Sequence, residues 1–219
     1  MKEIVIIGYG GHAKSLLDTI ETVGKYRIAG FVGKNKTDVC SYHGYKIIGT
    51  DSDWEQIYLS GIQYACMGIG YLGKGSVREE LYIKLKKIGF TFPPIIDPTS
   101  IVSKNVLIGE GSYIGKRVVI NTDTIIGKMA IINTGAIIEH NCIVNDFSHI
   151  AVAAVLCGGV KMGKGCLIGA NAVVCQGIKT GDASVVGAGA VVIKNVSAHS
   201  TVAGIPANII ISSKKMKTN

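Results

Sequence analysis

The second half of the chain repeats every six residues. From Ile96 to Ser197 it divides into seventeen consecutive hexads, such as INTGAI, IEHNCI and IGANAV, without one insertion. The first position is aliphatic or Met in sixteen of them, with Thr180 as the exception, and the fifth is always small or β-branched. Helices and hairpins have other periods, whereas hexapeptide repeats are typical of a parallel β-helix. Three hexads form one triangular coil, so between five and six coils are expected.

Each hexad should supply one flat face and one corner of the prism. We expect first-position side chains to stack inside it and the small fifth position to fit the tight corner. Because one coil takes eighteen residues, side chains eighteen apart should lie about 4.8 Å from each other on neighbouring coils.

The first ninety residues follow another pattern. The runs EIVIIG and RIAGFV are typical of buried strands, while GHAKSLLDTIETVG and SVREELYIKLKKIG have apolar residues at helical spacing. This alternation predicts a small parallel α/β unit of Rossmann-like type. Pro93-Pro94 separates the two patterns, so we expect domains at residues 1–92 and 93–219.

Composition excludes several classes of protein. The chain is 47% hydrophobic, but no run approaches the roughly 18 apolar residues of a membrane span, and the apolar start reads as a strand rather than a signal peptide. We therefore expect a cytoplasmic protein. The six cysteines form no CxxC pair, and we interpret them as reduced core residues: Cys40, Cys66, Cys142, Cys157, Cys166 and Cys175.

The net charge of +8 is compatible with solubilising lysines or with a phosphate-bearing ligand. Arginine is rare and does not alternate with aromatic residues, so nucleic acid is not an expected partner. Four lysines at exposed hexad positions, and the tail KKMK, are candidates for meeting phosphates, or else are only solvated: Lys161, Lys164, Lys179 and Lys194.

A glycine-rich turn, Gly8-Tyr9-Gly10-Gly11-His12-Ala13, follows the first expected strand and opens the first expected helix. Such a backbone can hold a phosphate at the helix N-terminus. The turn matches the dinucleotide pattern GxGxxA, but an NAD site needs an acid at the end of the second strand. Gly33 and Lys34 stand there instead, so we reject NAD.

His140 lies in the apolar stretch INTGAIIEHNC, at the third position of its hexad. A histidine that only fills the core would more often take the inward first position. The Cys and His pairs of a zinc site are missing around it, so we expect no metal. An imidazole that titrates near neutrality is suited to act as a general base.

The residue after His140 is Asn141, whose amide oxygen can accept from the ring N–H but carries no charge to stabilise an imidazolium. Asp123 is eighteen residues before Asn141 and should stack beneath it. Two interpretations stay open: Asp123 supplies the missing charge, or it is a solvated corner residue.

The hexads, the N-terminal IIGYGGHAKSLLDTI, the segment IEHNC…FSHIA and the late VAGIPA together resemble the bacterial sugar acyltransferases of the sialic acid O-acetyltransferase type. Close relatives in that family N-acetylate UDP-4-amino sugars. The resemblance covers nearly the whole chain. It implies a left-handed β-helix, acetyl-CoA as cosubstrate and a homotrimer. The spacing agrees with a trimer, because His149 lies nine residues after His140 and hence on the opposite side of one prism.

The resemblance also implies roles for individual residues. His140 matches the catalytic histidine, which the family usually follows with Asp or Glu. The residues that match its coenzyme contacts are His149, Gly158, Ala170 and Ala188, and Asn208 stands where a Lys is usual. The residues that match its nucleotide-sugar contacts are Gly10, Gly11, His12 and Gly70, together with Gly33 and Lys34, where UDP-sugar members often have Asp. Asn133 matches a residue near the acceptor sugar.

The sequence therefore predicts an acetyltransferase that carries acetyl from acetyl-CoA to a nucleotide-linked 4-amino sugar for surface-glycan synthesis, with His140 as base and direct transfer. Two alternatives remain: sialic acid O-acetylation, or a trimer that binds a sugar nucleotide and regulates without catalysis.

Overall fold

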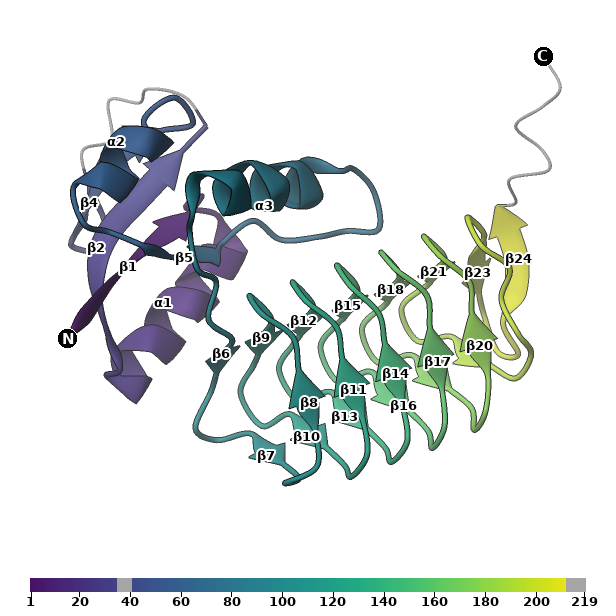
Figure 1. Cartoon of the computed structure of the whole chain (residues 1–219). Helices are drawn as coiled ribbons and strands as arrows, with labels where there is room; N and C mark the ends of the chain where they lie inside the picture. Colours follow the sequence, from purple (N-terminus) through teal and green to yellow (C-terminus); the bar gives the residue numbers. More distant parts are fainter. Residues whose placement is uncertain (35–40, 212–219) are drawn as a thin grey trace, which may run out of the picture. The chain divides into compact units, whose positions relative to one another are not determined.

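The computed structural model describes residues 1–34 and 41–211. The chain divides into two compact units, coloured along the sequence in Figure 1. The first unit holds Met1–Gly70 and Gly75–Pro98, and the second holds Tyr71–Lys74 together with the chain from Thr99 onward.

The first unit is built on a five-stranded sheet in the order β3-β4-β2-β1-β5. The contacts of β1 with β2 and β5, and of β2 with β4, are parallel, whereas β3 and β4 form an antiparallel hairpin. Its elements are β1 (Lys2–Ile7), α1 (Gly11–Val23), β2 (Tyr26–Gly33), β3 (Ser41–Tyr42), β4 (Tyr45–Thr50), α2 (Trp54–Leu59), β5 (Tyr64–Met67), α3 (Val77–Ile88) and β6 (Ile95–Ile96).

The predicted strands and helices of this unit are confirmed. Four consecutive residues of β1, from Ile4 to Ile7, are at most 1% exposed, as expected for a parallel strand covered on both faces. Helix α1 buries Leu16, Leu17 and Ile20 on one face and ends at Gly24, whose φ of 63° lies in the left-handed region.

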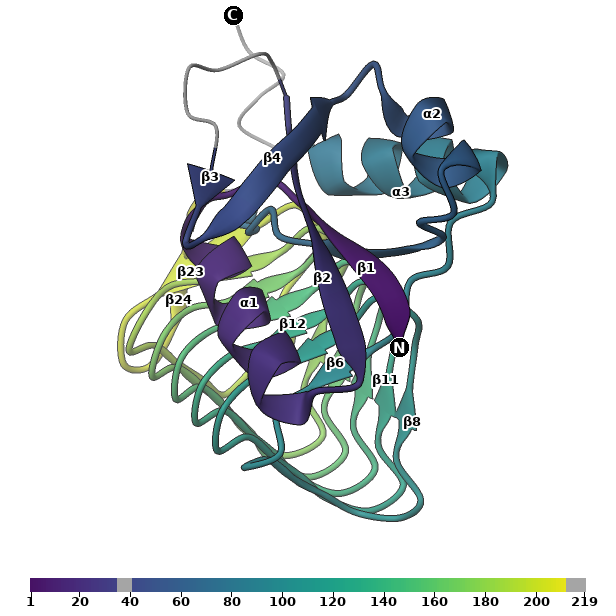
Figure 2. The ribbon, with the colours of Figure 1, turned by 90° about the vertical axis from the view of Figure 1, so that its left-hand side faces the viewer.

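The second unit is a left-handed parallel β-helix of short strands, and Figure 2 shows its triangular coils. One stack contains β7 (Ile101–Val102), β10 (Val119–Ile120), β13 (Ile137–Ile138), β16 (Val155–Leu156), β19 (Val173–Val174) and β22 (Val191–Val192). The second contains β8 (Leu107–Ile108), β11 (Ile125–Ile126), β14 (Ile143–Val144), β17 (Lys161–Met162) and β20 (Lys179–Thr180). The third contains β9 (Tyr113–Ile114), β12 (Ile131–Ile132), β15 (His149–Ile150), β18 (Leu167–Ile168), β21 (Val185–Val186) and β23 (Thr201–Ala203), which pairs antiparallel with β24 (Asn208–Ile211).

The eighteen-residue coil is confirmed by the strand register. Ile120 pairs with Ile138, Ile138 with Leu156, and Leu156 with Val174. Every first-position side chain from Ile114 to Val192 is at most 2% exposed, including the exceptional Thr180. The first position of each hexad therefore fills the inside of the prism, as the repeat predicts.

The corners differ from the expectation in one respect. The left-handed backbone occurs at the fourth position, with φ of 57° at Asp123, 59° at Asn141 and 57° at Asn171. Fifth-position side chains such as Ala136 and Cys142 are instead fully buried just inside the corner. The fifth position is therefore small because interior space is limited there, whereas the fourth position makes the turn.

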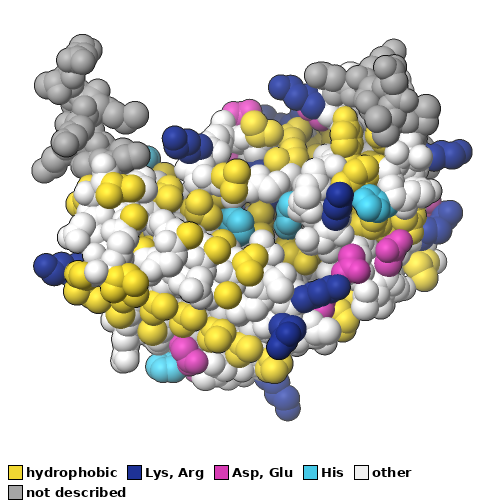
Figure 3. All heavy atoms as spheres, turned by 180° about the vertical axis from the view of Figure 1, so that it is seen from behind, with side chains coloured by type: hydrophobic (Ala, Val, Ile, Leu, Met, Phe, Trp, Pro, Cys, Tyr) yellow, Lys and Arg dark blue, Asp and Glu magenta, His cyan; other side chains and the backbone are white. Residues whose placement is uncertain are grey.

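One outer face of the coils is aliphatic. The sixth position of the hexads in the first stack carries only Ile and Val, and these side chains are exposed or half-buried: Ile101, Val119, Ile137, Val155, Val173 and Val191. Figure 3 shows rows of hydrophobic side chains gathered over the coils.

Candidate active site

The glycine-rich turn of the first unit opens onto a cavity of about 750 Å³ at the carboxyl end of β1. A Cβ atom added to Gly10 or Gly11 would meet nothing within 4 Å, so the backbone there is open to a ligand. The carboxyl ends of parallel strands are the usual ligand position in open α/β sheets. The cavity is lined by Ile7, Gly8, Tyr9, Gly10, Val32, Gly33, Lys34, Asp51, Ile69, Val77, Glu80, Leu81 and Lys84.

Three of the predicted nucleotide-sugar residues, Gly10, Gly33 and Lys34, line this cavity. Gly11 and His12 begin α1 immediately beside it. A Cβ atom on Gly70 would lie 3.7 Å from the Cβ atom of His12, so these two residues are also neighbours. The structure therefore gathers the predicted residues of this unit around one turn.

Tyr9 explains why position 33 carries no side chain. A Cβ atom on Gly33 would lie 2.6 Å from Cε1 of the Tyr9 ring, a distance that real Cβ atoms do not adopt. The Tyr9 ring also lies 6.0 Å, between centroids, from the ring of Tyr42. An aromatic ring thus occupies the space that a side chain at position 33 would need.

Asp51 is a cavity residue that the sequence analysis missed. It directly follows β4, whose last residue, Thr50, pairs with Gly33 of β2. The dinucleotide pattern predicts an acid only at the end of the second strand. The run GTDSD was the available signal, but nothing in the sequence placed it beside β2.

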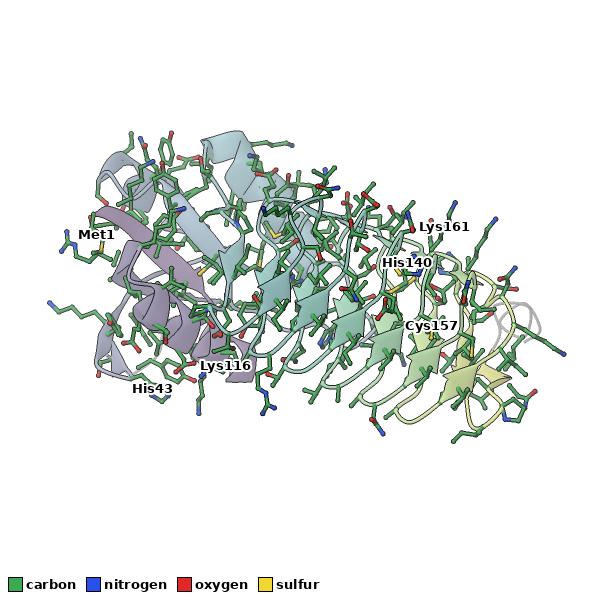
Figure 4. All side chains as sticks on the ribbon, turned by 90° about the horizontal axis from the view of Figure 1, so that it is seen from below. Met1, His43, Lys116, His140, Cys157 and Lys161 are labelled. Carbon is green, nitrogen blue, oxygen red and sulfur yellow. The ribbon has the colours of Figure 1, made fainter. Side chains whose placement is uncertain are left out.

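His140 lies exposed at the corner between β13 and β14, and Figure 4 shows its side chain on the coils, with Cys157 and Lys161 on the next coil. Its Nδ1 atom is 2.8 Å from Oδ1 of Asn141. An amide oxygen can only accept, so Nδ1 carries the proton and Nε2 of the neutral ring keeps its lone pair. Asn141 tolerates the left-handed corner because Asn is among the few residues that adopt it readily.

The His140 ring also rests against the coil that follows. A Cβ atom on Gly158, eighteen residues later, would lie 2.7 Å from both Cε1 and Nε2 of His140. The missing side chain at Gly158 therefore leaves the space that the imidazole fills.

Asp123 occupies the same corner position as Asn141, one coil earlier, and it is exposed. Its carboxylate accepts a hydrogen bond of 3.5 Å from Asn105 Nδ2, which belongs to the coil before it. The predicted stacking of positions 123 and 141 follows from the strand register, since Val119 pairs with Ile137.

His149 lies in β15 and is only 8% exposed. Its Nδ1 atom is 2.7 Å from the carbonyl oxygen of Tyr71, which can only accept, so Nδ1 carries the proton. The Tyr71 hydroxyl donates to the carbonyl of Gly165 at 2.7 Å. A Cβ atom on Gly73 would lie 2.8 Å from Val185 Cγ2, so this glycine allows the segment Tyr71–Lys74 to lie close to the coils. No motif or periodicity in the sequence indicates that this segment contacts the coils.

The remaining predicted residues lie on the outer surface of the coils. Ala170 and Ala188 are exposed and occupy the same hexad position on neighbouring coils. Gly189 N donates to Ala170 O at 2.8 Å, which links these two coils. Asn133 is half-buried, and its Oδ1 accepts from the backbone N–H of Thr134 at 2.8 Å.

The prediction that all six cysteines are core residues is wrong for two of them. Cys66, Cys142 and Cys166 are buried, but Cys157 and Cys175 are half-buried at the corner that carries His140; Cys40 lies outside the described residues. Burial raises the pKa of the Cys142 and Cys157 thiols above the usual value. Both thiols are therefore protonated near neutral pH and poorly suited to act as nucleophiles.

Within residues 1–34 and 41–211, no three or more His, Cys, Asp or Glu side chains are grouped closely enough to hold a metal ion. In the same part of the chain, no helix has the length and apolar character needed to cross a membrane.

Comparisons with known proteins place this geometry in context. The model of the PglD N-terminal domain matches residues 3–85, and the model of the hexapeptide repeat of succinyl-transferase matches residues 159–194. No curated protein matches the sequence.

Solved structures match almost the whole chain. A histidine-to-alanine variant of GDP-perosamine N-acetyltransferase from Caulobacter crescentus, in complex with CoA and GDP-perosamine, is 32% identical, with a TM-score of 0.91 over 97% of this chain and 98% of that one. The acetyltransferase domain of PglB from Neisseria gonorrhoeae is 28% identical, with a TM-score of 0.88 over 96% and 100%. WeeI from Acinetobacter baumannii is 24% identical, with a TM-score of 0.82 over 96% and 100%, and supports the fold alone.

Proposed function

The chain belongs to the sugar acetyltransferases of the NeuD/PglD type, with acetyl-CoA as cosubstrate, and from that premise we propose that its acceptor is the 4-amino group of a nucleotide-linked sugar used in bacterial surface glycans. An amine acceptor is supported by the relative at 32% identity, which is an N-acetyltransferase solved with GDP-perosamine. The observation that carries the chemistry is the hydrogen bond of 2.8 Å between His140 and Asn141.

His140 acts as the general base in this proposal. Asn141 holds the proton on Nδ1, so the lone pair of Nε2 faces away from Asn141 and is available to the acceptor. The amine attacks the thioester carbonyl, His140 Nε2 takes the proton from the attacking nitrogen, and the tetrahedral intermediate collapses to the amide and free coenzyme A. The raised pKa of the Cys157 thiol supports direct transfer rather than an acyl-enzyme.

Acetyl-CoA is proposed to bind along the outer surface of the coils at Ala170 and Ala188, in contact with the largely buried His149 and with Gly158 nearby. Exposed alanines at equivalent positions of successive coils leave room for an extended pantetheine arm. His149 supports such a site because Tyr71 holds its ring in a single tautomer.

A homotrimer is proposed because two features need a partner. The Ile and Val side chains of the first stack form an aliphatic outer face that a second copy of the chain would cover. His140 and His149 come from different sides of one prism, and a neighbouring subunit would bring the two histidines to a shared cleft.

The N-terminal domain is proposed to hold the nucleotide part of the acceptor, with the boundary near residue 92. Its cavity of about 750 Å³ has the size of a small-molecule site and an open glycine turn for phosphate. The C-terminal domain, residues 93–219, is proposed to bind the coenzyme and to carry out the transfer, with Asn133 near the acceptor sugar.

The test is thiol release from acetyl-CoA in the presence of UDP-, GDP- and CMP-linked 4-amino sugars, with sialic acid as a hydroxyl acceptor. We expect turnover with an amino sugar nucleotide and a loss of about 10²- to 10⁴-fold in kcat for His140→Ala, with little change in coenzyme affinity. A His140→Ala variant that keeps wild-type kcat would place the base elsewhere, and turnover with sialic acid alone would assign O-acetylation.

A further inference from the structure

Asp51 stands in a defined place at the carboxyl edge of the first unit's sheet. Thr50 pairs with Gly33, so Asp51 and Lys34 continue two adjacent parallel strands at the same level. The sheet order places β2 between β1 and β4. Neighbouring strands are about 4.8 Å apart, so Asp51 lies roughly two strand spacings, about 10 Å, from the glycine turn that ends β1.

At about 10 Å from the glycine turn, Asp51 is too far away to contact a phosphate bound at that turn, or the ribose next to it. In dinucleotide-binding sheets, the phosphate lies at the turn after the first strand, and an acid at the end of the adjacent strand binds the ribose. Here the adjacent strand ends at Gly33, and the Tyr9 ring fills the space of its side chain. Asp51 is one strand further out, where a nucleotide that starts at the glycine turn presents its base.

The carboxylate of Asp51 is available to a ligand. Lys84 Nζ donates to the backbone carbonyl of Asp51 at 2.6 Å, which holds the main chain. Asp53 accepts from the backbone N–H of Thr50 at 2.7 Å and shapes the same turn. Within residues 1–34 and 41–211, no hydrogen bond or ion pair engages the Asp51 carboxylate, although Asp51 lines the cavity.

The other cavity walls suit a nucleobase. Tyr9 offers an aromatic ring, and Ile69, Val77 and Leu81 add apolar surface. The second carboxylate of the cavity, Glu80, already accepts a hydrogen bond from the Ser76 hydroxyl. Among the described residues that line the cavity, Asp51 is therefore the carboxylate that remains to contact the edge of a base.

A carboxylate discriminates strongly among bases because it can only accept. Guanine presents two adjacent donors, N1–H and N2–H, which match the two oxygens in a bidentate, charge-assisted pair. Uracil presents one N–H between two carbonyl oxygens, which a carboxylate repels. Adenine and cytosine each present one amino group beside an acceptor nitrogen. We propose, building on the function above, that Asp51 is a specificity-determining residue that selects a guanosine diphosphate sugar over its uridine counterpart.

The experiment is calorimetric titration of the full-length protein with GDP, UDP, CDP and ADP, without coenzyme. We expect the wild type to bind GDP most tightly. Asp51→Asn should weaken GDP binding by about 10- to 100-fold, the range typical of a lost bidentate base contact, and change UDP binding by less than about threefold. Glu55→Gln is the matched control, because Glu55 is an exposed carboxylate of α2 outside the cavity lining.

Three results would overturn the inference. Equal wild-type affinity for all four diphosphates would remove base selection. An equal loss for all four in Asp51→Asn, with an unchanged circular dichroism spectrum, would assign Asp51 to the ribose instead. If none of the four bound, the proposed nucleotide-sugar site itself would fail, since this assay requires no acetyl transfer.

Discussion

Replacing Gly158 by Ala tests whether this glycine positions the imidazole of the proposed base, His140, or contacts the coenzyme. The new Cβ atom would lie 2.7 Å from Cε1 and Nε2 of His140. Ordinary contact begins at 3.4 Å, so the ring has to move by at least about 0.7 Å or leave its hydrogen bond to Asn141. The backbone of Gly158 is not left-handed, so alanine itself is tolerated there.

The magnitude follows from the displacement. A misplacement of about 1 Å in a catalytic group can cost about 100-fold in rate, which is about 2.7 kcal/mol of transition-state free energy. We therefore expect kcat of Gly158→Ala to fall about 100-fold while KM for acetyl-CoA stays within about threefold. The double variant His140→Ala/Gly158→Ala should be no slower than His140→Ala alone, because the two changes act on one group.

The neighbouring glycine supplies a matched control. Gly159 has φ of 71°, so alanine there strains the backbone, but its Cβ atom would meet nothing closer than 4.0 Å. Gly159→Ala should lower the free energy of unfolding by about 1–2 kcal/mol and keep kcat. If Gly158→Ala keeps wild-type kcat and raises KM for the coenzyme instead, then Gly158 serves the coenzyme and the steric argument is refuted.

Two further predictions concern charge and assembly. Asn141→Asp should move the acid limb of the pH–rate profile to higher pH, because a carboxylate stabilises the imidazolium. If Asp123 already supplies that charge, Asn141→Asp will change the pH–rate profile little, and Asp123→Asn will lower turnover instead. Unchanged pH–rate profiles for both variants would reject the idea that a negative charge assists His140. Wild type should sediment as a trimer at micromolar concentration, and Val155→Lys, which places a charge on the aliphatic face, should shift it to monomers; a monomeric wild type would refute the assembly and the shared cleft.

The β-helix was predictable because the repeat has a rigid period. Every coil takes eighteen residues, so the register of Ile120 with Ile138 and of positions 123 with 141 follows from counting. The role of the fourth position was missed because residues as different as Arg117, Met129 and Phe147 adopt its left-handed conformation. The fourth position therefore has no characteristic residue type. The fifth position does have one, because the limited space inside the corner admits only small or β-branched side chains.

The site was predictable only where it follows the period. His140 contacts the next residue, Asn141, and Gly158, which is one coil of eighteen residues later. Both contacts can therefore be predicted from residue spacing alone. Asp51 and Tyr71 lie outside the repeat. Their positions depend on strand order and on a segment that lies against the coils, and neither is encoded in local spacing.

The neutral partner of His140 is informative about the acceptor. Asn141 fixes the tautomer as well as a carboxylate would, because any acceptor facing Nδ1 leaves the lone pair on Nε2. It contributes less once the ring becomes charged, since an amide has only a dipole to offer. A hydroxyl nucleophile must lose its proton while it attacks, and so depends on a base whose charged form is well stabilised. An amine attacks with its own lone pair, and the proton then leaves a nitrogen that is already positive and strongly acidic. As the proposed base, a histidine held by Asn141 is therefore better suited to N-acetylation than to O-acetylation, which favours the proposed amino sugar as the acceptor.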